Sequence, residues 1–141
     1  MRSYDVALAS LAIDAPLKWT DNLLSHYDIP DVVSAKRGIS RRITPPALVL
    51  LALTRQLHME FGTGVGDALT LATMLLSAEN NGVLEKGHLR LSFDRVTLER
   101  TLARRLSDAL ESAPTPRRGR PPRAVAAQYA ARHARGRPSL M

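Results

Sequence analysis

The sequence predicts a mainly α-helical protein with small β elements, followed by a tail without regular structure. Up to residue 113, several stretches carry apolar residues at helical spacing, and Pro or Gly separates most of these stretches. Two shorter segments have the β-branched or alternating pattern of strands. Beyond residue 113 the chain is rich in Arg, Ala, Pro and Gly, with little that could be buried. We therefore expect a folded domain over residues 1–113 and a disordered basic tail over residues 114–141.

Two short helices should open the folded domain. Residues 4–13 are largely apolar and predict a short, mostly buried helix, which residues 14–16 interrupt. Because proline favours the first turn of a helix, a second helix should follow over residues 16–27. At 100° per residue its apolar positions share one face. The polar residues on the opposite face are Lys18, Asp21, Asn22 and Ser25. Such a pair has the form of a helix-turn-helix.

A basic hairpin is predicted next. Residues 32–35 and 39–43 lean towards β structure and flank a turn that contains Gly38. The cations of this segment are Lys36, Arg37, Arg41 and Arg42. They give the hairpin the densest positive charge of the folded domain.

Two longer helices should follow the hairpin. Thr44 before two prolines predicts a helix start, and this helix should run to Phe61. The glycines of residues 62–66 predict a turn rather than a phosphate loop, because no strand precedes them and no Gly-Lys-Ser/Thr ending follows. The next helix, over residues 67–79, is apolar nearly all round and should be central to the core.

A strand and an amphipathic helix should complete the domain. Residues 87–93 alternate between apolar and polar side chains, which is typical of a half-buried strand, and Val83 and Leu84 could pair with it across residues 85–86. Asp94 should cap a terminal helix over residues 94–112. Leucine recurs there every four residues, at Leu98, Leu102, Leu106 and Leu110. This stripe either packs on the domain itself or pairs with the same helix of a second copy.

The whole net charge of +7 lies in the tail. Up to residue 113, 13 Lys and Arg balance 13 Asp and Glu, whereas residues 114–141 contain seven arginines and no acidic residue. A GC-rich genome would explain the excess of arginine over lysine, but it would not explain a tail without acids. A neutral domain with a cationic tail indicates a polyanionic partner, which in a cell is most often nucleic acid.

The tail repeats the tetrapeptide Arg-Gly-Arg-Pro at residues 118–121 and 135–138. This repeat resembles the core of the AT-hook, a motif that binds the minor groove of A·T-rich DNA. Narrow A·T tracts have an enhanced negative potential that attracts inserted arginine. The alternative is a solvated cationic tail that binds any phosphate backbone. The tail arginines predicted as DNA-binding residues are Arg117, Arg118, Arg120, Arg123, Arg135 and Arg137.

The order of elements over residues 4–80 looks like the winged helix-turn-helix of MerR-type transcription regulators. In that family the wing ends in an Arg-aromatic-Ser/Thr step, and a turn with glycine joins the two helices that follow. Residues 42–44 stand at the step here, and Phe61 and Gly62 stand at the turn. Ile43 replaces the usual aromatic residue. The family's effector-binding cysteines and large ligand domain are absent, so its metal and drug sensing is not expected here.

The resemblance implies that residues 16–27 form the recognition helix. Lys18, Asn22 and Ser25 would then face the major groove, where Asn can pair with adenine and Lys with guanine. The hairpin cations Lys36, Arg37, Arg41 and Arg42 would contact phosphates or the adjacent minor groove. Asp21 is out of place on this face, because phosphates repel it. Trp19, at the edge of the buried face, is expected to be part of the core rather than to contact bases.

Several other classes of protein are not expected. Without cysteine there is no disulfide framework, thiolate zinc site or thiol redox chemistry. The four histidines are far apart with no ligand spacing, and no catalytic motif stands out. We therefore expect no enzyme activity, metal, cofactor or small-molecule effector. The sequence shows no signal peptide and no run of apolar residues long enough to span a membrane, so we expect a cytoplasmic, nucleoid-associated protein.

These observations predict a bacterial protein that binds double-stranded DNA, with a tail that prefers A·T-rich sequence, and that acts as a transcription regulator. A homodimer through the 94–112 helix is expected, because short DNA-binding modules gain affinity from two half-sites. Two alternatives stay open. One is a sequence-tolerant architectural protein in which the tail does most of the binding. The other is a protein-interaction module, such as an antitoxin.

Overall fold

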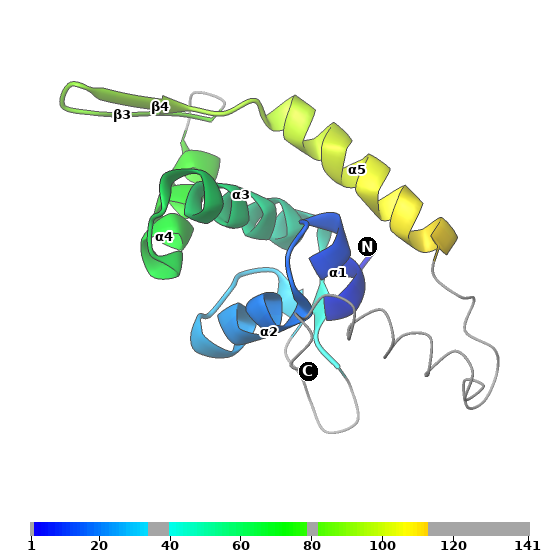
Figure 1. Ribbon diagram of the computed structural model, residues 1–141. Helices are drawn as coiled ribbons and strands as arrows, with labels where there is room; N and C mark the ends of the chain where they lie inside the picture. Colours follow the sequence, from blue (N-terminus) through cyan, green and yellow to red (C-terminus); the bar gives the residue numbers. More distant parts are fainter. Residues whose placement is uncertain (1, 34–39, 79–81, 113–141) are drawn as a thin grey trace, which may run out of the picture. The chain divides into compact units, whose positions relative to one another are not determined.

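The computed structural model describes residues 2–33, 40–78 and 82–112 of the 141-residue chain. Residues 1–110 form one compact unit, which contains all but the last two described residues. The elements, in chain order (Figure 1), are α1 Val6–Ala12, α2 Leu17–His26, β1 Val32–Val33, β2 Arg42–Ile43, α3 Pro45–Phe61, α4 Val65–Ser77, β3 Val83–Lys86, β4 Leu89–Ser92 and α5 Arg95–Ser112. The described chain is mainly helical with two small antiparallel strand pairs, which confirms the predicted fold class. The predicted disorder of residues 114–141 lies outside the described residues.

Helix α3 forms the centre of the core. Nine of its 17 residues are buried, and Leu51 is fully buried. The helix begins and ends where the sequence predicts, with proline in its first turn and with Gly62 in the left-handed conformation at φ 65°. This glycine closes the helix because a side chain would be strained there.

Helix α4 is not central to the core, and that prediction is wrong. Only Ala68, Ala72 and Leu75 of α4 are buried. Among the described elements, α4 packs closely against α3 and the start of β3, which leaves most of its other apolar side chains half-buried. A helix with apolar residues on all sides is therefore not necessarily at the centre of the core.

A tight turn joins α1 to α2 and sets their angle. Asp14 adopts a positive φ of 55°, a conformation that short polar residues tolerate better than most. The hydroxyls of Ser10 on α1 and Thr20 on α2 are both buried and hydrogen-bond each other at 2.8 Å. Because buried hydroxyls need partners, this bond ties α2 to α1. The two predicted helices and the turn between them are confirmed, except that α1 begins at Val6 and Tyr4, predicted as helical, forms a bridge with Ile43 instead.

The strands β1 and β2 form the base of the predicted hairpin. Val32 lies opposite Ile43, and Val33 lies opposite Arg42. Tyr4 joins the pair through two backbone hydrogen bonds of 2.8 Å with Ile43, whose side chain is fully buried. The antiparallel pairing is as predicted, but residues 40 and 41, predicted as strand, precede β2. The rest of the predicted hairpin, residues 34–39, lies outside the described residues.

The second strand pair, β3–β4, differs from its prediction in two ways. The turn falls at Gly87 and His88, with Gly87 at φ 58°, so residues 85 and 86 belong to β3 rather than to the turn. Every residue of β4 is exposed, so the prediction of a half-buried strand is wrong. The alternation of apolar and polar side chains is present, but no described element covers its apolar face.

Helix α5 begins at its predicted cap and packs one side on the unit. The backbone N–H of Thr97 donates to the Asp94 carboxylate at 3.1 Å, and the Thr97 hydroxyl donates to it at 2.6 Å. Within the leucine stripe, Leu102 is buried, while Leu98 and Leu106 pack partly buried against the core. Leu110 remains 57% exposed. Most of the stripe therefore packs within the subunit, the first of its two predicted roles.

Acid should loosen the start of α5. The side-chain and backbone hydrogen bonds from Thr97 hold the pKa of Asp94 below its ordinary value of 3.8. The cap therefore stabilises the fold above that value, and its contribution is lost as the pH falls through the lowered folded-state pKa. We expect the amide-exchange protection of residues 97–100 to drop in this acid range before that of the middle of α5. Asp94→Ala should show the same loss already at neutral pH, and unchanged protection in that variant would contradict the capping role.

Candidate nucleic-acid interface

Helix α2 presents a polar face whose orientation is set by its buried side. Thr20, Leu23 and Leu24 are buried, so the opposite side faces solvent. The predicted site residues on that side, Lys18, Asn22 and Ser25, are all exposed, as is Asp21. Within the described residues, the side chains of Lys18 and Asn22 have no hydrogen bond or ion pair, so their polar groups are available to a partner. Their spacing of four residues places them next to each other along the helix.

Arg41 connects the segment before β2 to this face of α2. Its Nη1 donates to Asp21 Oδ1 at 3.2 Å, and its two terminal nitrogens lie 3.3 and 3.4 Å from Ser25 Oγ. The Arg41 side chain is 27% exposed, and that of Asp21 is 61% exposed. Asp21, the acidic residue on this face of α2, is thus paired with a cation. Exposed pairs of this kind contribute only about 0–1 kcal/mol, so a competing phosphate can displace the carboxylate.

Arg42, by contrast, is used within the fold. Its Nη2 donates to the backbone carbonyl of Ser3 at 2.7 Å, and its Nε donates to Ser3 Oγ at 3.1 Å. These bonds hold the N-terminal segment beside β2, next to the backbone pairing of Tyr4 and Ile43. Of the two adjacent arginines, Arg41 lies with the α2 residues, and Arg42 lies with the N-terminal segment.

The remaining predicted contacts lie outside the described residues. Lys36 and Arg37 belong to the segment between β1 and β2 that is not described. The same holds for the tail arginines Arg117, Arg118, Arg120, Arg123, Arg135 and Arg137. The structure therefore brings together Lys18, Asn22, Ser25 and Arg41 from the predicted set.

A cluster of side chains between α2 and α3 was not predicted from the sequence. The guanidinium of Arg55 lies 5.0 Å from the ring centre of Trp19, and the ring of His58 stacks on the same indole with centroids 6.1 Å apart. Trp19 is half-buried and packs against the core, as expected. Its Nε1 is buried without a hydrogen-bond partner within the described residues. Arg55 and His58, both on α3, lie 36 and 39 positions after Trp19 in the sequence. No local sequence pattern predicts a contact between residues so far apart. The cluster fixes α2 against α3.

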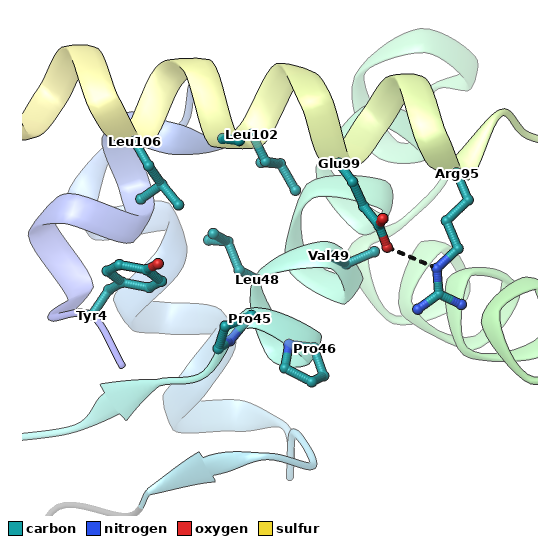
Figure 2. Close-up of a pocket in the computed structure, with 10 residues that line it drawn as sticks. Tyr4, Pro45, Pro46, Leu48, Val49, Arg95, Glu99, Leu102 and Leu106 are labelled. Atoms are coloured by element: carbon teal, nitrogen blue, oxygen red, sulfur yellow. Dashed lines mark hydrogen bonds and ion pairs between the residues drawn. The ribbon is translucent and has the colours of Figure 1, made fainter. Parts of the chain in front are cut away.

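An apolar cavity of about 350 Å³ lies between α5 and the start of α3 (Figure 2). In Figure 2, Leu102 and Leu106 of α5 point toward Leu48 and Tyr4. Among the described residues that line it, the only charged side chains are those of Arg95 and Glu99, which form an ion pair of 3.0 Å with each other. A small-molecule site usually adds a few convergent polar groups to an apolar pocket, and this wall offers none beyond that pair and the Tyr4 hydroxyl. The cavity therefore does not point to a specific ligand.

The other motifs from the sequence have structural roles where they are described. Residues 62–64 join α3 to α4, as predicted, but α4 begins at Val65, so Gly66 belongs to its first turn rather than to the link. A Cβ on Gly66 would lie 2.9 Å from the Tyr27 hydroxyl. His58 Nδ1 lies 2.6 Å from the backbone carbonyl of Thr63, so this nitrogen carries the proton and donates. Across residues 2–33, 40–78 and 82–112, no three His, Asp or Glu gather as a metal site. None of the helices in these ranges is both long and apolar enough to cross a membrane.

Comparisons of this chain with protein-family models, with curated proteins and with solved structures find no match. The resemblance to MerR-type regulators therefore remains a prediction. What points to a function is the chain's own chemistry, namely the outward face of α2, Arg41 beside it and the arginine tail.

Proposed function

We propose that this protein binds double-stranded DNA, with α2 in the major groove and with basic residues around β1–β2 and in the tail on the phosphates or the minor groove. The observation that carries the proposal is the outward face of α2. Lys18 and Asn22 are exposed and free of protein partners within the described residues, while the other face of the helix is buried. Helix-turn-helix proteins present side chains to base edges in this way: one face of the recognition helix packs on the protein, and the polar face is exposed.

The dimensions of α2 suit this role. A helix with its side chains is about 10–12 Å wide, close to the roughly 12 Å width of the major groove. Lys18 and Asn22 lie about 6 Å apart along the helix axis, which is roughly two base-pair steps. Lys18 could donate to the guanine acceptors and Asn22 could pair with adenine two steps away. Ser25 would sit one turn further along, where Arg41 already contacts it.

Arg41 supplies the phosphate contact closest to α2. In the free protein its charge neutralises Asp21, which lowers the repulsion between this face and the phosphate backbone. Lys36 and Arg37 precede it in the chain, outside the described residues, and we propose that they also contact phosphates. Arg42 is bound to Ser3, so its part in the proposal is to hold the N-terminal segment and β2 in place.

The tail adds affinity, and a second copy would add a second half-site. Seven arginines without an acidic residue form a strong, salt-sensitive phosphate ligand, and their Arg-Gly-Arg-Pro repeats favour A·T-rich minor groove. We propose a homodimer and a role in bacterial transcription regulation. On α5 itself, the exposed apolar side chains left for a second copy include Val96 and Leu110.

The proposal is tested by selecting bound duplexes from a pool of random sequences with the full-length protein. We expect enrichment of a short motif that contains both guanine and adenine. Binding without any enriched motif would favour the architectural alternative, in which the tail dominates. No duplex binding at low salt would contradict the proposal and favour a protein-interaction module.

Removing the carboxylate of Asp21 should strengthen DNA binding in general. Asp21→Asn frees Arg41 from its ion pair and removes one negative charge near the phosphates. We expect about two- to fivefold tighter binding to unrelated duplexes at low salt, and less at high salt, because exposed charges are screened. Fluorescence anisotropy titrations measure this change. Asp108→Asn, the same charge change at an exposed position of α5, is the control, and an equal gain in both variants would contradict a local role for Asp21.

A further inference from the structure

The β3–β4 hairpin has one apolar and one polar face. Cross-strand partners share a face, so the pairs Leu84–Leu91 and Lys86–Leu89 place three leucines and the alkyl stem of a lysine on one side. The opposite side carries Glu85 and Arg90, which form an ion pair of 3.5 Å across the strands. This amphipathic pattern is typical of a hairpin whose leucine side packs against another surface.

That leucine side is not covered within the described chain. Leu89 is 74% exposed and Leu91 is 37% exposed, while Leu84 at the base packs against the core. In Figure 1 the hairpin extends away from α3 and α4. A two-stranded hairpin alone in water is marginally stable at best, and it gains stability when one face packs against another surface.

A groove beside the hairpin is likewise not filled by any part of the chain that the structure describes. It has a volume of about 1,020 Å³ and runs along the second half of α3, facing α5. Its wall includes Leu53, Met59 and Phe61, and the latter two side chains are 59% and 71% exposed. Leu91 of the hairpin also lines it. The exposed apolar surfaces of the hairpin and of the groove are therefore continuous in one subunit.

We propose that two copies of this chain exchange these hairpins, so that the leucine face of each β3–β4 hairpin lies in the α3–α5 groove of the other copy. The inference deepens the homodimer that the proposed function includes and rests on that part of it. Because the hairpin adjoins the groove in each subunit, a twofold axis near Leu91 brings each hairpin to the other groove with the same contacts made twice.

The length and the charge of the groove both support the β3–β4 hairpin of a second copy as its occupant. Four residues of β4 span about 13 Å, and the ten α3 residues along the groove, 52–61, span about 15 Å. The groove carries the carboxylates of Asp14 and Glu60, which have no ion pair within the described residues. Its two arginines are engaged elsewhere, Arg55 on the ring of Trp19 and Arg105 on the carbonyl of Ala12. With Asp94 the groove wall holds three carboxylates against these two guanidiniums, so Lys86, next to Leu89 on the leucine face, meets one excess negative charge.

Two exposed leucines distinguish this interface from one on α5. Leu89→Glu places a charge on the leucine face, whereas Leu110→Glu places the same charge on the exposed end of the α5 stripe. Sedimentation equilibrium of the full chain should give a dimer for the original sequence and for Leu110→Glu. For Leu89→Glu it should give a monomer, or a dissociation constant raised by at least about tenfold, because burying an unpaired carboxylate is costly. A monomeric original chain, or loss of the dimer only in Leu110→Glu, would overturn the proposal.

Because the chain has no cysteine, a disulfide reports the contact directly. A Leu89→Cys chain and a Met59→Cys chain are mixed in equal amounts and oxidised mildly. We expect a covalent heterodimer from this mixture and little from a control mixture of Leu110→Cys and Met59→Cys. Equal yields in both mixtures would overturn the exchange. Neither test involves DNA, so failure here leaves the DNA-binding proposal to be judged by its own experiment.

Discussion

Removing residues 114–141 should reduce the slope of log K against log salt by up to about 6, because each of seven arginines that neutralises a phosphate contributes about 0.9. Raising the salt concentration from 50 to 200 mM would then reduce the tail's contribution to the binding constant by a factor on the order of a thousand. Anisotropy titrations of full-length and shortened protein over that salt range measure the difference. Residues 1–110 form a compact unit of their own, so the shortened chain should retain its helical circular dichroism spectrum.

Two full-length variants separate charge from length and from groove preference. Replacing the seven tail arginines with glutamine should reduce the slope as much as truncation does. Replacing them with lysine should keep the slope but reduce the preference for A·T-rich duplexes, because narrow minor grooves favour inserted arginine. An unchanged slope after truncation would show that the tail does not contact DNA. An unchanged A·T preference in the lysine variant would reduce the tail to a general polycation.

Asn22→Ala and Lys18→Ala should each lower the preference for the selected site over a site with the paired base changed. A good side-chain pair with a base edge contributes about 1–3 kcal/mol of discrimination, which is roughly a 5- to 150-fold loss. Asn22→Ala should leave the salt slope unchanged, because an uncharged amide releases no counterion. Lys18→Ala should lower the slope by at most about 1. Competition titrations with matched and altered duplexes measure both effects.

Neither substitution should change the stability of the fold, because both side chains are exposed. Thr70→Ala, an exposed polar residue of α4, is the control and should keep the full preference. Specificity that survives in both α2 variants would mean that bases are read by another part of the chain.

The order of elements could be predicted because local signals mark their ends. Thr44, the two prolines after it and Gly62 define α3 to the residue, and Asp94 defines the start of α5. The outward face of α2 also followed from helical periodicity, since Lys18 and Asn22 lie opposite the buried Leu23 and Leu24. Such signals act within a few residues of one another, so a single sequence carries them.

The partners of side chains could not be predicted, because they depend on contacts between distant segments. Arg41 and Arg42 are adjacent and chemically identical, yet one pairs with Asp21 and the other with Ser3. The burial of α4 and β4 was overestimated for the same reason. An apolar pattern shows that a face can be buried, but which face is buried depends on what the rest of the fold places against it.

The central claim is that the folded unit chooses the site on DNA and the arginine tail strengthens binding there. Footprinting across a whole genome with the full-length protein and with its tail-glutamine variant tests this division most directly. We predict that both proteins protect the same sites, with the variant needing a much higher concentration. If the variant protects no defined sites at any concentration, or if full-length protein covers A·T-rich DNA without a shared motif, the folded unit does not select the site and the claim is contradicted.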